Sequence, residues 1–515
     1  MLSALIELGN VQRKGRSLGG DALYLTLQAG VQLASGTIFY IVIVRLFSTT
    51  IVGAIALMMA IVSLFSVIFS FGLGSAASHF ISFHIGKGDY SSAKKSIQRI
   101  VLYGFILSFV GFGVTVLFAP YLSMIFFKSY SYVSIVRLVS TVVLATILMN
   151  VLNGSLRGLQ LFRLSAIISI VIWAVYYFGA IFLAFFVRSI HAIVIAWIIG
   201  MFLGVLIEAV ILWRIQNRFP ERGGVLSTNE LFLYSTPILL SSLISYGASY
   251  TDRFVVAGLM HLSELGVYNF ALLITSSVGF IAAPFTSILL PKFSEFFGQN
   301  HKDAIRSNVK SSITVLSFLY IPAALGIASL SPMILHLLGG VQYDSGSSAL
   351  RIIMFSSALF VGVNILSPAV SGIRKTRIFL FSSAASLISN VAVSVALIPP
   401  FGLIGASLGY SSVYAASFLV VFYFARKEGV SSFNLKSLGK IWISSLSMFT
   451  TVFLLVTFVS SSLILLPVYI AFGAGVYLGL VKALKAIEHT DRDLLVSILS
   501  DNLRVFRRLV VMLWS

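Results

Sequence analysis

A small set of polar side chains interrupts the long apolar segments of this chain, and these side chains could bind a polar ligand. Gln28 and Gln32 are four residues apart, so a helix places them on one face. They could line a polar cavity there, or hydrogen-bond to a neighbouring helix. Arg45 lies toward the end of the same segment. Its guanidinium could contact a phosphate, or could extend along the apolar surface toward water.

A second polar group lies between residues 242 and 253. Ser245 and Ser249 share one stripe of the expected helix, where small side chains usually let helices approach closely. Asp252 and Arg253 follow. Because neighbouring residues on a helix do not face each other, we expect each to have a separate partner. Arg253 could contact an anionic group, and Asp252 could line a cavity or couple to an ion; the alternative for both is a place at a membrane interface.

The remaining polar candidates are isolated residues in other apolar segments. Glu208 is a carboxylate that burial could make able to exchange protons or bind Na⁺, although it could equally pair with a nearby cation. His79 could touch a pyrophosphate when it is protonated, or could be an ordinary interfacial histidine. Asn269 and Asn364 could bond sugar hydroxyls, but asparagines in such segments usually hydrogen-bond to neighbouring helices.

The elements that must position these residues are about fourteen apolar segments. Each is roughly 20 residues long, which is what a helix needs to cross about 30 Å of hydrocarbon. The chain is 58% hydrophobic and only 10% charged, which excludes a soluble globular surface. The sequence therefore predicts an all-α integral membrane protein. The expected segments begin near Asp21, Val52, Ile100, Val136, Ala166, Ala192, Phe232, Leu265, Ser312, Leu350, Phe379, Leu403, Ile441 and Leu463.

The positive charges predict the orientation. With the N-terminus placed inside, all but six of the 35 lysines and arginines lie on the cytoplasmic side. We therefore expect a multi-pass plasma-membrane protein with both termini in the cytoplasm. The net charge of +19 is spread over many short loops, so attraction to anionic membrane lipids explains it better than nucleic-acid binding. The six exceptions are Arg45, Lys128, Arg137, Arg188, Arg253 and Arg351.

The chain also repeats itself weakly, with a period of about 212 residues; Gly53 and Gly266 occupy equivalent places. Six segments per repeat is an even number, so the two halves should have the same orientation. We predict an N-terminal lobe over 1–218, a cytoplasmic linker over 219–230 and a C-terminal lobe over 231–428. Two extra spans are expected over 429–488, followed by an amphipathic cytoplasmic tail helix over 489–515.

Several phrases of the sequence resemble one known family. They are VRLFSTTIVG at 44–53, FGLGSAASHFIS at 71–82, GKGD at 86–89, TPILLSSLISYGASYTDRFVVAGLM from Thr236, LGVYNFALLI from Leu265, LPKFSEFFGQ from Leu290 and LSPAVSGIRKTR from Leu366. In order and spacing they resemble the oligosaccharide and polysaccharide flippases of the multidrug/oligosaccharidyl-lipid/polysaccharide exporter superfamily. One position departs from the pattern, since His79 stands where such proteins often have arginine.

The resemblance implies two parallel-repeat six-helix lobes in a V, around a central cavity that opens alternately to each side. It implies a lipid-linked oligosaccharide as the partner, on a polyprenyl phosphate or pyrophosphate carrier. We expect a monomer without cofactor or bound metal, and not an enzyme. A membrane glycosyltransferase or polymerase would need an acidic site on a sizeable outer loop, which the short loops do not offer. A multidrug or organic-cation antiporter remains the alternative, although Asp and Glu are missing from the middle of the first five segments.

Overall fold

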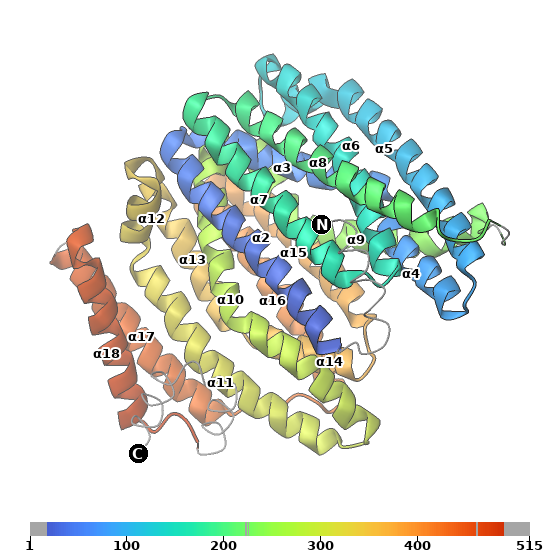
Figure 1. Cartoon of the computed structure of the whole chain (residues 1–515). Helices are drawn as coiled ribbons and strands as arrows, with labels where there is room; N and C mark the ends of the chain where they lie inside the picture. Colours follow the sequence, from blue (N-terminus) through green and yellow to red (C-terminus); the bar gives the residue numbers. More distant parts are fainter. Residues whose placement is uncertain (1–17, 222–223, 225, 460–461, 489–515) are drawn as a thin grey trace. The chain divides into compact units, whose positions relative to one another are not determined.

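The computed structural model describes residues 18–221, 224, 226–459 and 462–488, and this part of the chain is helical, with no strand among the described residues (Figure 1). Within these described ranges, thirteen helices are long and apolar enough to cross a membrane, or fourteen if one bent pair counts as a single span. The predicted all-α architecture of about fourteen spans is therefore confirmed. The predicted tail helix, 489–515, lies outside the described residues.

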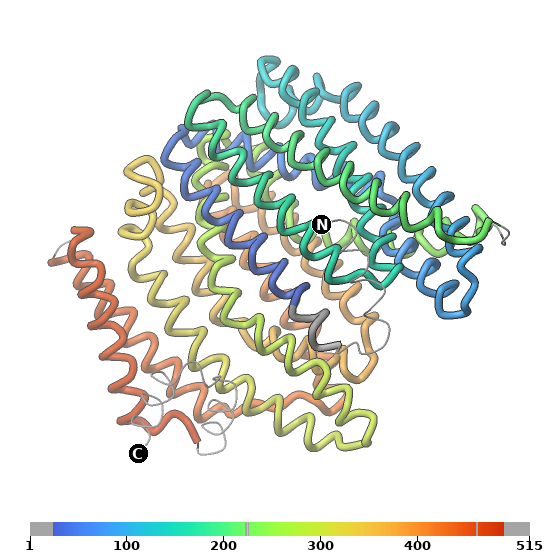
Figure 2. Tube along the Cα trace, in the orientation of Figure 1, coloured from blue at the N-terminus to red at the C-terminus, as the bar shows by residue number. Residues whose placement is uncertain are grey.

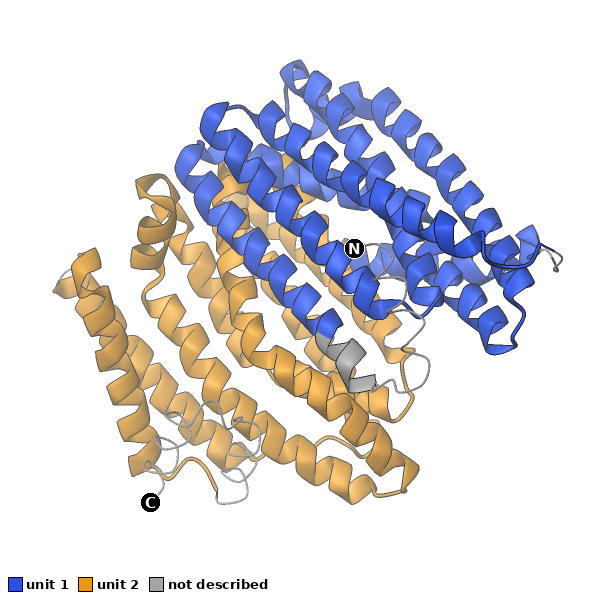
Figure 3. Ribbon diagram, viewed as in Figure 1, with its two compact units in different colours: residues 1–246 blue, residues 247–515 orange. Residues whose placement is uncertain are grey.

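The chain divides into two compact units, residues 1–246 and 247–515 (Figure 3). The division falls inside helix α9 (Thr228–Leu259), so residues 219–230 belong to the first unit. The other helices of the first unit are α2 (Leu18–Leu46), α3 (Thr49–Ser70), α4 (Leu73–Gly86), α5 (Tyr90–Phe126), α6 (Val133–Gly158), α7 (Phe162–Phe186) and α8 (Ile190–Gln216).

Helix α6 is the centre of the first unit. It packs against α3, α4, α5 and α8, while α7 packs between α2 and α8. The α4–α6 crossing is very close, because a Cβ atom added to Gly154 would lie 2.2 Å from the carbonyl oxygen of Gly74. Only glycine at position 154 allows the two backbones to approach this closely.

The second predicted span is not one helix. It breaks at Phe71 and Gly72, which both have left-handed backbone angles with φ of 48° and 69°. Gly72 readily adopts this conformation because it has no Cβ atom. The two left-handed residues end α3 and let α4 start in a new direction. Asp89 then caps α5, and hydrogen bonds from Ser92 and Ser91 lower the pKa of its carboxyl to about 2.

The segment that follows α8 is attached to the start of α5 by side-chain contacts. Lys94 forms an ion pair with Glu221 at 3.5 Å. Arg99 donates to the carbonyl oxygen of Leu226. These contacts hold the chain against the first unit before α9 begins.

Over its described residues, the second unit contains the rest of α9 and nine further α-helices. α15 and α16 pack tightly, and α17 packs against both α11 and α18 (Figures 1 and 2). α13 and α14 form the bent pair, with an angle of 43° between them. The helices are α10 (Leu262–Gly298), α11 (Lys302–Ser329), α12 (Ser331–Gly339), α13 (Ser347–Leu359), α14 (Val363–Gly372), α15 (Ile378–Phe401), α16 (Leu403–Lys427), α17 (Leu435–Phe458) and α18 (Leu466–Ala483).

Candidate functional site

A buried ion pair in the second unit brings together four of the residues singled out in the sequence. Nη1 of Arg253 lies 3.4 Å from Oδ1 of Asp252 and donates to the backbone carbonyl of Ser249 at 2.8 Å. Nε of Arg253 donates to Oδ1 of Asn269 at 3.1 Å. Helix α9 supplies the first three residues and α10 supplies the fourth, so the group joins two helices.

The expectation that Asp252 and Arg253 point apart is wrong in one respect, because their side chains form an ion pair. The long arginine side chain reaches back along its own helix to the Ser249 carbonyl, and this brings Nη1 beside the carboxylate. Each residue also has the separate partner that was expected. For Asp252 it is Tyr268, whose hydroxyl donates to Oδ2 at 2.9 Å.

Asp252 is completely buried, whereas the Arg253 side chain keeps 15% of its surface exposed. A guanidinium carries five N–H groups. Three are used in the contacts above, and the Nη2 amino group donates to none of the described residues. The cation also lies over the Tyr250 ring, 4.6 Å from its centroid. The site is therefore a fixed cation with two N–H donors left for an anion.

Asn364 does not hydrogen-bond to this ion-pair group. The Asn364 side-chain amide donates to the Val361 carbonyl at 3.1 Å, beside the bend between α13 and α14. Ser245 lies in the part of α9 that belongs to the first unit. Tyr268 and Tyr250 are the residues of the group that the sequence analysis missed. No sequence signal marks them, because the Tyr268 contact depends on how α10 packs against α9, and the Tyr250 contact on the path of the Arg253 side chain.

The predicted residues of the first unit lie at separate places. The side chains of Gln28 and Gln32 are partly exposed on α2. Arg45 is exposed in the last turn of α2. The His79 ring stacks on Tyr234, with centroids 4.5 Å apart and planes 12° apart.

Glu208 lies in a second polar group, where three helices of the first unit meet. It is completely buried on α8, and its Oε1 accepts from Nδ2 of Asn153 on α6 at 3.0 Å. The same Nδ2 lies 3.4 Å from the hydroxyl of Ser169 on α7. Oε2 of Glu208 and Nε of Arg157 are both buried without a hydrogen-bond partner among the described residues.

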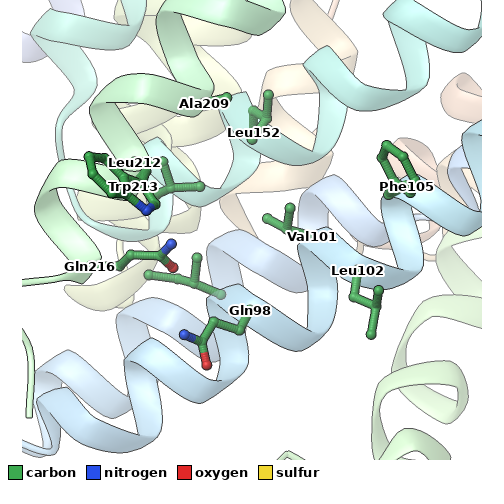
Figure 4. Close-up of a pocket in the computed structure, with 10 residues that line it drawn as sticks. Gln98, Val101, Leu102, Phe105, Leu152, Ala209, Leu212, Trp213 and Gln216 are labelled. Atoms are coloured by element: carbon green, nitrogen blue, oxygen red, sulfur yellow. The ribbon is translucent and has the colours of Figure 1, made fainter. Parts of the chain in front are cut away.

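A groove of about 420 Å³ lies between α5, α6 and α8 (Figure 4). Its lining is mostly apolar, with the amides of Gln98 and Gln216 toward one end. Leu152 and Ala209 line it, and these residues directly adjoin Asn153 and Glu208 in sequence. Within the described residues there is no group of three His, Cys, Asp or Glu side chains that could hold a metal ion.

Membrane-length helices that enclose polar groups define a multi-pass membrane protein. Residues 42–348 match the model of a family described as "Polysaccharide biosynthesis protein". This match covers more than half of the chain, and the chain belongs to that family.

Similar proteins agree with this assignment. The probable low-salt glycan biosynthesis flippase Agl15 of Haloferax volcanii is 25% identical, over 90% of this chain and 94% of that protein. The structure of a lipid II flippase, MurJ, in an inward closed conformation superposes with a TM-score of 0.72 at 17% identity, covering 90% of this chain and 98% of that one. An inward-facing multidrug resistance MATE transporter of the MOP superfamily gives a TM-score of 0.63 at 17% identity. The match covers 77% of this chain and 94% of that one. The two structures establish the fold.

Proposed function

We propose that this protein moves a lipid-linked oligosaccharide from the cytoplasmic to the outer leaflet by alternating access. Membership of the polysaccharide biosynthesis family supports this function, as does similarity to a glycan flippase over nearly the whole chain. The observation that carries most weight is the Arg253 group. It is a cation fixed by three hydrogen bonds with two donors unused, and it suits the phosphate of a lipid-linked sugar.

The physical need for such a group follows from the cargo. A phosphate left unpaired in hydrocarbon costs many kcal/mol, so the protein must supply donors and positive charge along its path. Arg253 does so with a planar fork that matches phosphate oxygens, and Asn269 and the Ser249 carbonyl keep that fork in place. Asp252 keeps the buried cation balanced when no cargo is bound.

We further propose that the carrier is a polyprenyl phosphate or pyrophosphate, that the protein is a plasma-membrane monomer and that it is not an enzyme. The loop charges support cytoplasmic termini. The other predicted contacts stay predictions. They are Gln28, Gln32, Arg45, His79, Ser245 and Asn364.

Organic-cation antiport is the second candidate, because a multidrug transporter shares the fold. A binding site for an organic cation needs an accessible carboxylate. The carboxylates inside the spans of the described chain include Asp252, which is paired, and Glu208, which is completely buried. This arrangement favours an anionic cargo.

The test is reconstitution of the full-length protein in vesicles that contain a fluorescent polyprenyl-pyrophosphate oligosaccharide in the inner leaflet. We expect the sugar to become accessible to an external glycosidase at a rate that depends on the protein. A parallel set of vesicles loaded with a fluorescent organic cation should show no protein-dependent efflux. Cation efflux without movement of the sugar would overturn the proposal.

A further inference from the structure

We propose that Glu208 is a reversible proton-binding site in the first unit and that Arg157 is its ion-pair partner once the proton leaves. This inference extends the proposed flippase function by naming an ion that could drive it. It rests on the polar group that α6, α7 and α8 enclose, which is separate from the Arg253 group of the second unit.

The geometry around Glu208 suits a carboxyl group that carries a proton. The residue is completely buried, and no cation lies within ion-pair distance among the described residues. An ionised carboxylate in such a place costs several kcal/mol unless it is paired. Its neighbour Asn153 suits both charge states. The Nδ2 donates to a carboxylate, and after rotation of the amide its Oδ1 accepts from the protonated acid.

Arg157 is placed to stabilise the other state. It lies one helical turn after Asn153 on α6, the residue whose amide donates to Glu208. The neighbouring helix α7 contributes the neutral hydroxyl of Ser169. Within the described part of the chain, Nε of Arg157 is a buried donor without an acceptor, and Oε2 of Glu208 is a buried acceptor without a donor.

Each buried polar atom without a hydrogen bond lowers the stability of the fold. The two atoms lie on adjacent helices, and a direct contact between them would satisfy both. Loss of the proton would create the charge that draws the arginine to the carboxylate. Protonation would release it. Glu208 could therefore alternate between two side-chain arrangements that shift α8 against α6.

The closing experiment uses the full-length protein in vesicles, with the native chain, Glu208→Gln and Glu230→Gln compared. Glu230 is an exposed glutamate in the first turn of α9 and serves as the control. Infrared difference spectra across a pH titration should show a protonated carboxylic acid that Glu208→Gln removes and Glu230→Gln keeps. In an Arg157→Met variant that acid should persist to higher pH, because the positive charge that favours ionisation is gone.

Transport is the second readout. The rate of flipping in native vesicles should change when a pH gradient is applied, and Glu208→Gln should abolish that change while Glu230→Gln retains it. An infrared spectrum without a carboxylic acid signal from Glu208 at any pH would overturn the proposal. Failure of all variants to move the sugar would instead contradict the proposed function, because the infrared titration does not depend on transport.

Discussion

Substitutions in the Asp252–Arg253 pair should affect the unfolding free energy and the flipping rate differently, and this difference can be measured. Arg253→Ala removes the hydrogen bonds to Asn269 and to the Ser249 carbonyl together with the ion pair. Asp252 would then be a completely buried carboxylate held by the Tyr268 hydroxyl. Breaking a buried pair in this way costs about 3–5 kcal/mol of unfolding free energy.

The partner substitution should be milder. Asp252→Asn keeps an acceptor for Nη1 of Arg253, and the new amide can still pair with the Tyr268 hydroxyl. The loss of one charged hydrogen bond costs about 1.5–3 kcal/mol. The double variant contains neither buried charge, so its cost should fall below the sum of the single variants by about 2 kcal/mol.

The assay is an unfolding titration in mixed micelles for the four proteins of this cycle, followed by flipping measurements on those that fold. If Arg253 binds the cargo, the double variant should flip at least tenfold more slowly than Asp252→Asn when both rates are normalised to the amount of folded protein. Arg351→Ala is the matched control, since that arginine donates to the Ala328 carbonyl and stacks on a phenylalanine ring elsewhere in the unit. Additive unfolding energies would refute the coupling, and equal flipping rates would remove Arg253 from the cargo site.

Two further substitutions test the packing of the first unit. Gly154→Ala forces a methyl group against the Gly74 carbonyl and should destabilise the protein by about 1–3 kcal/mol in the same unfolding titration. The control is Gly113→Ala, whose added methyl group meets open space and should be neutral or stabilising. Equal effects of the two variants would contradict the close crossing of α4 and α6. Arg99→Ala removes the donor to the Leu226 carbonyl and should expose the segment before α9 to limited proteolysis without changing the span helices. An unchanged cleavage rate would show that this contact does not hold the segment.

The number and positions of the spans could be predicted because hydrophobic length is a local property. Most long apolar runs in the sequence correspond to one helix; the exceptions are the second run, which is broken between α3 and α4, and the bent pair that contains α13 and α14. The break at Phe71 and Gly72 was not predicted, since the hydropathy of an apolar run is the same whether its helix is straight or broken. The close approach of Gly74 and Gly154 depends on a contact between distant parts of the chain. Hydropathy contains no information about such contacts.

The sequence likewise does not show which buried carboxylates have hydrogen-bonding partners. The sequence marks Asp252 and Glu208 equally, as single carboxylates inside apolar spans. The structure separates them by their partners, because Asp252 has an arginine and a tyrosine within hydrogen-bonding distance, while Glu208 has one amide and a buried oxygen that no described residue satisfies. Asp252, held by Arg253 and Tyr268, suits a counter-charge for that arginine. Glu208 is the proposed proton site instead, so the two acidic residues suit different steps of one transport cycle.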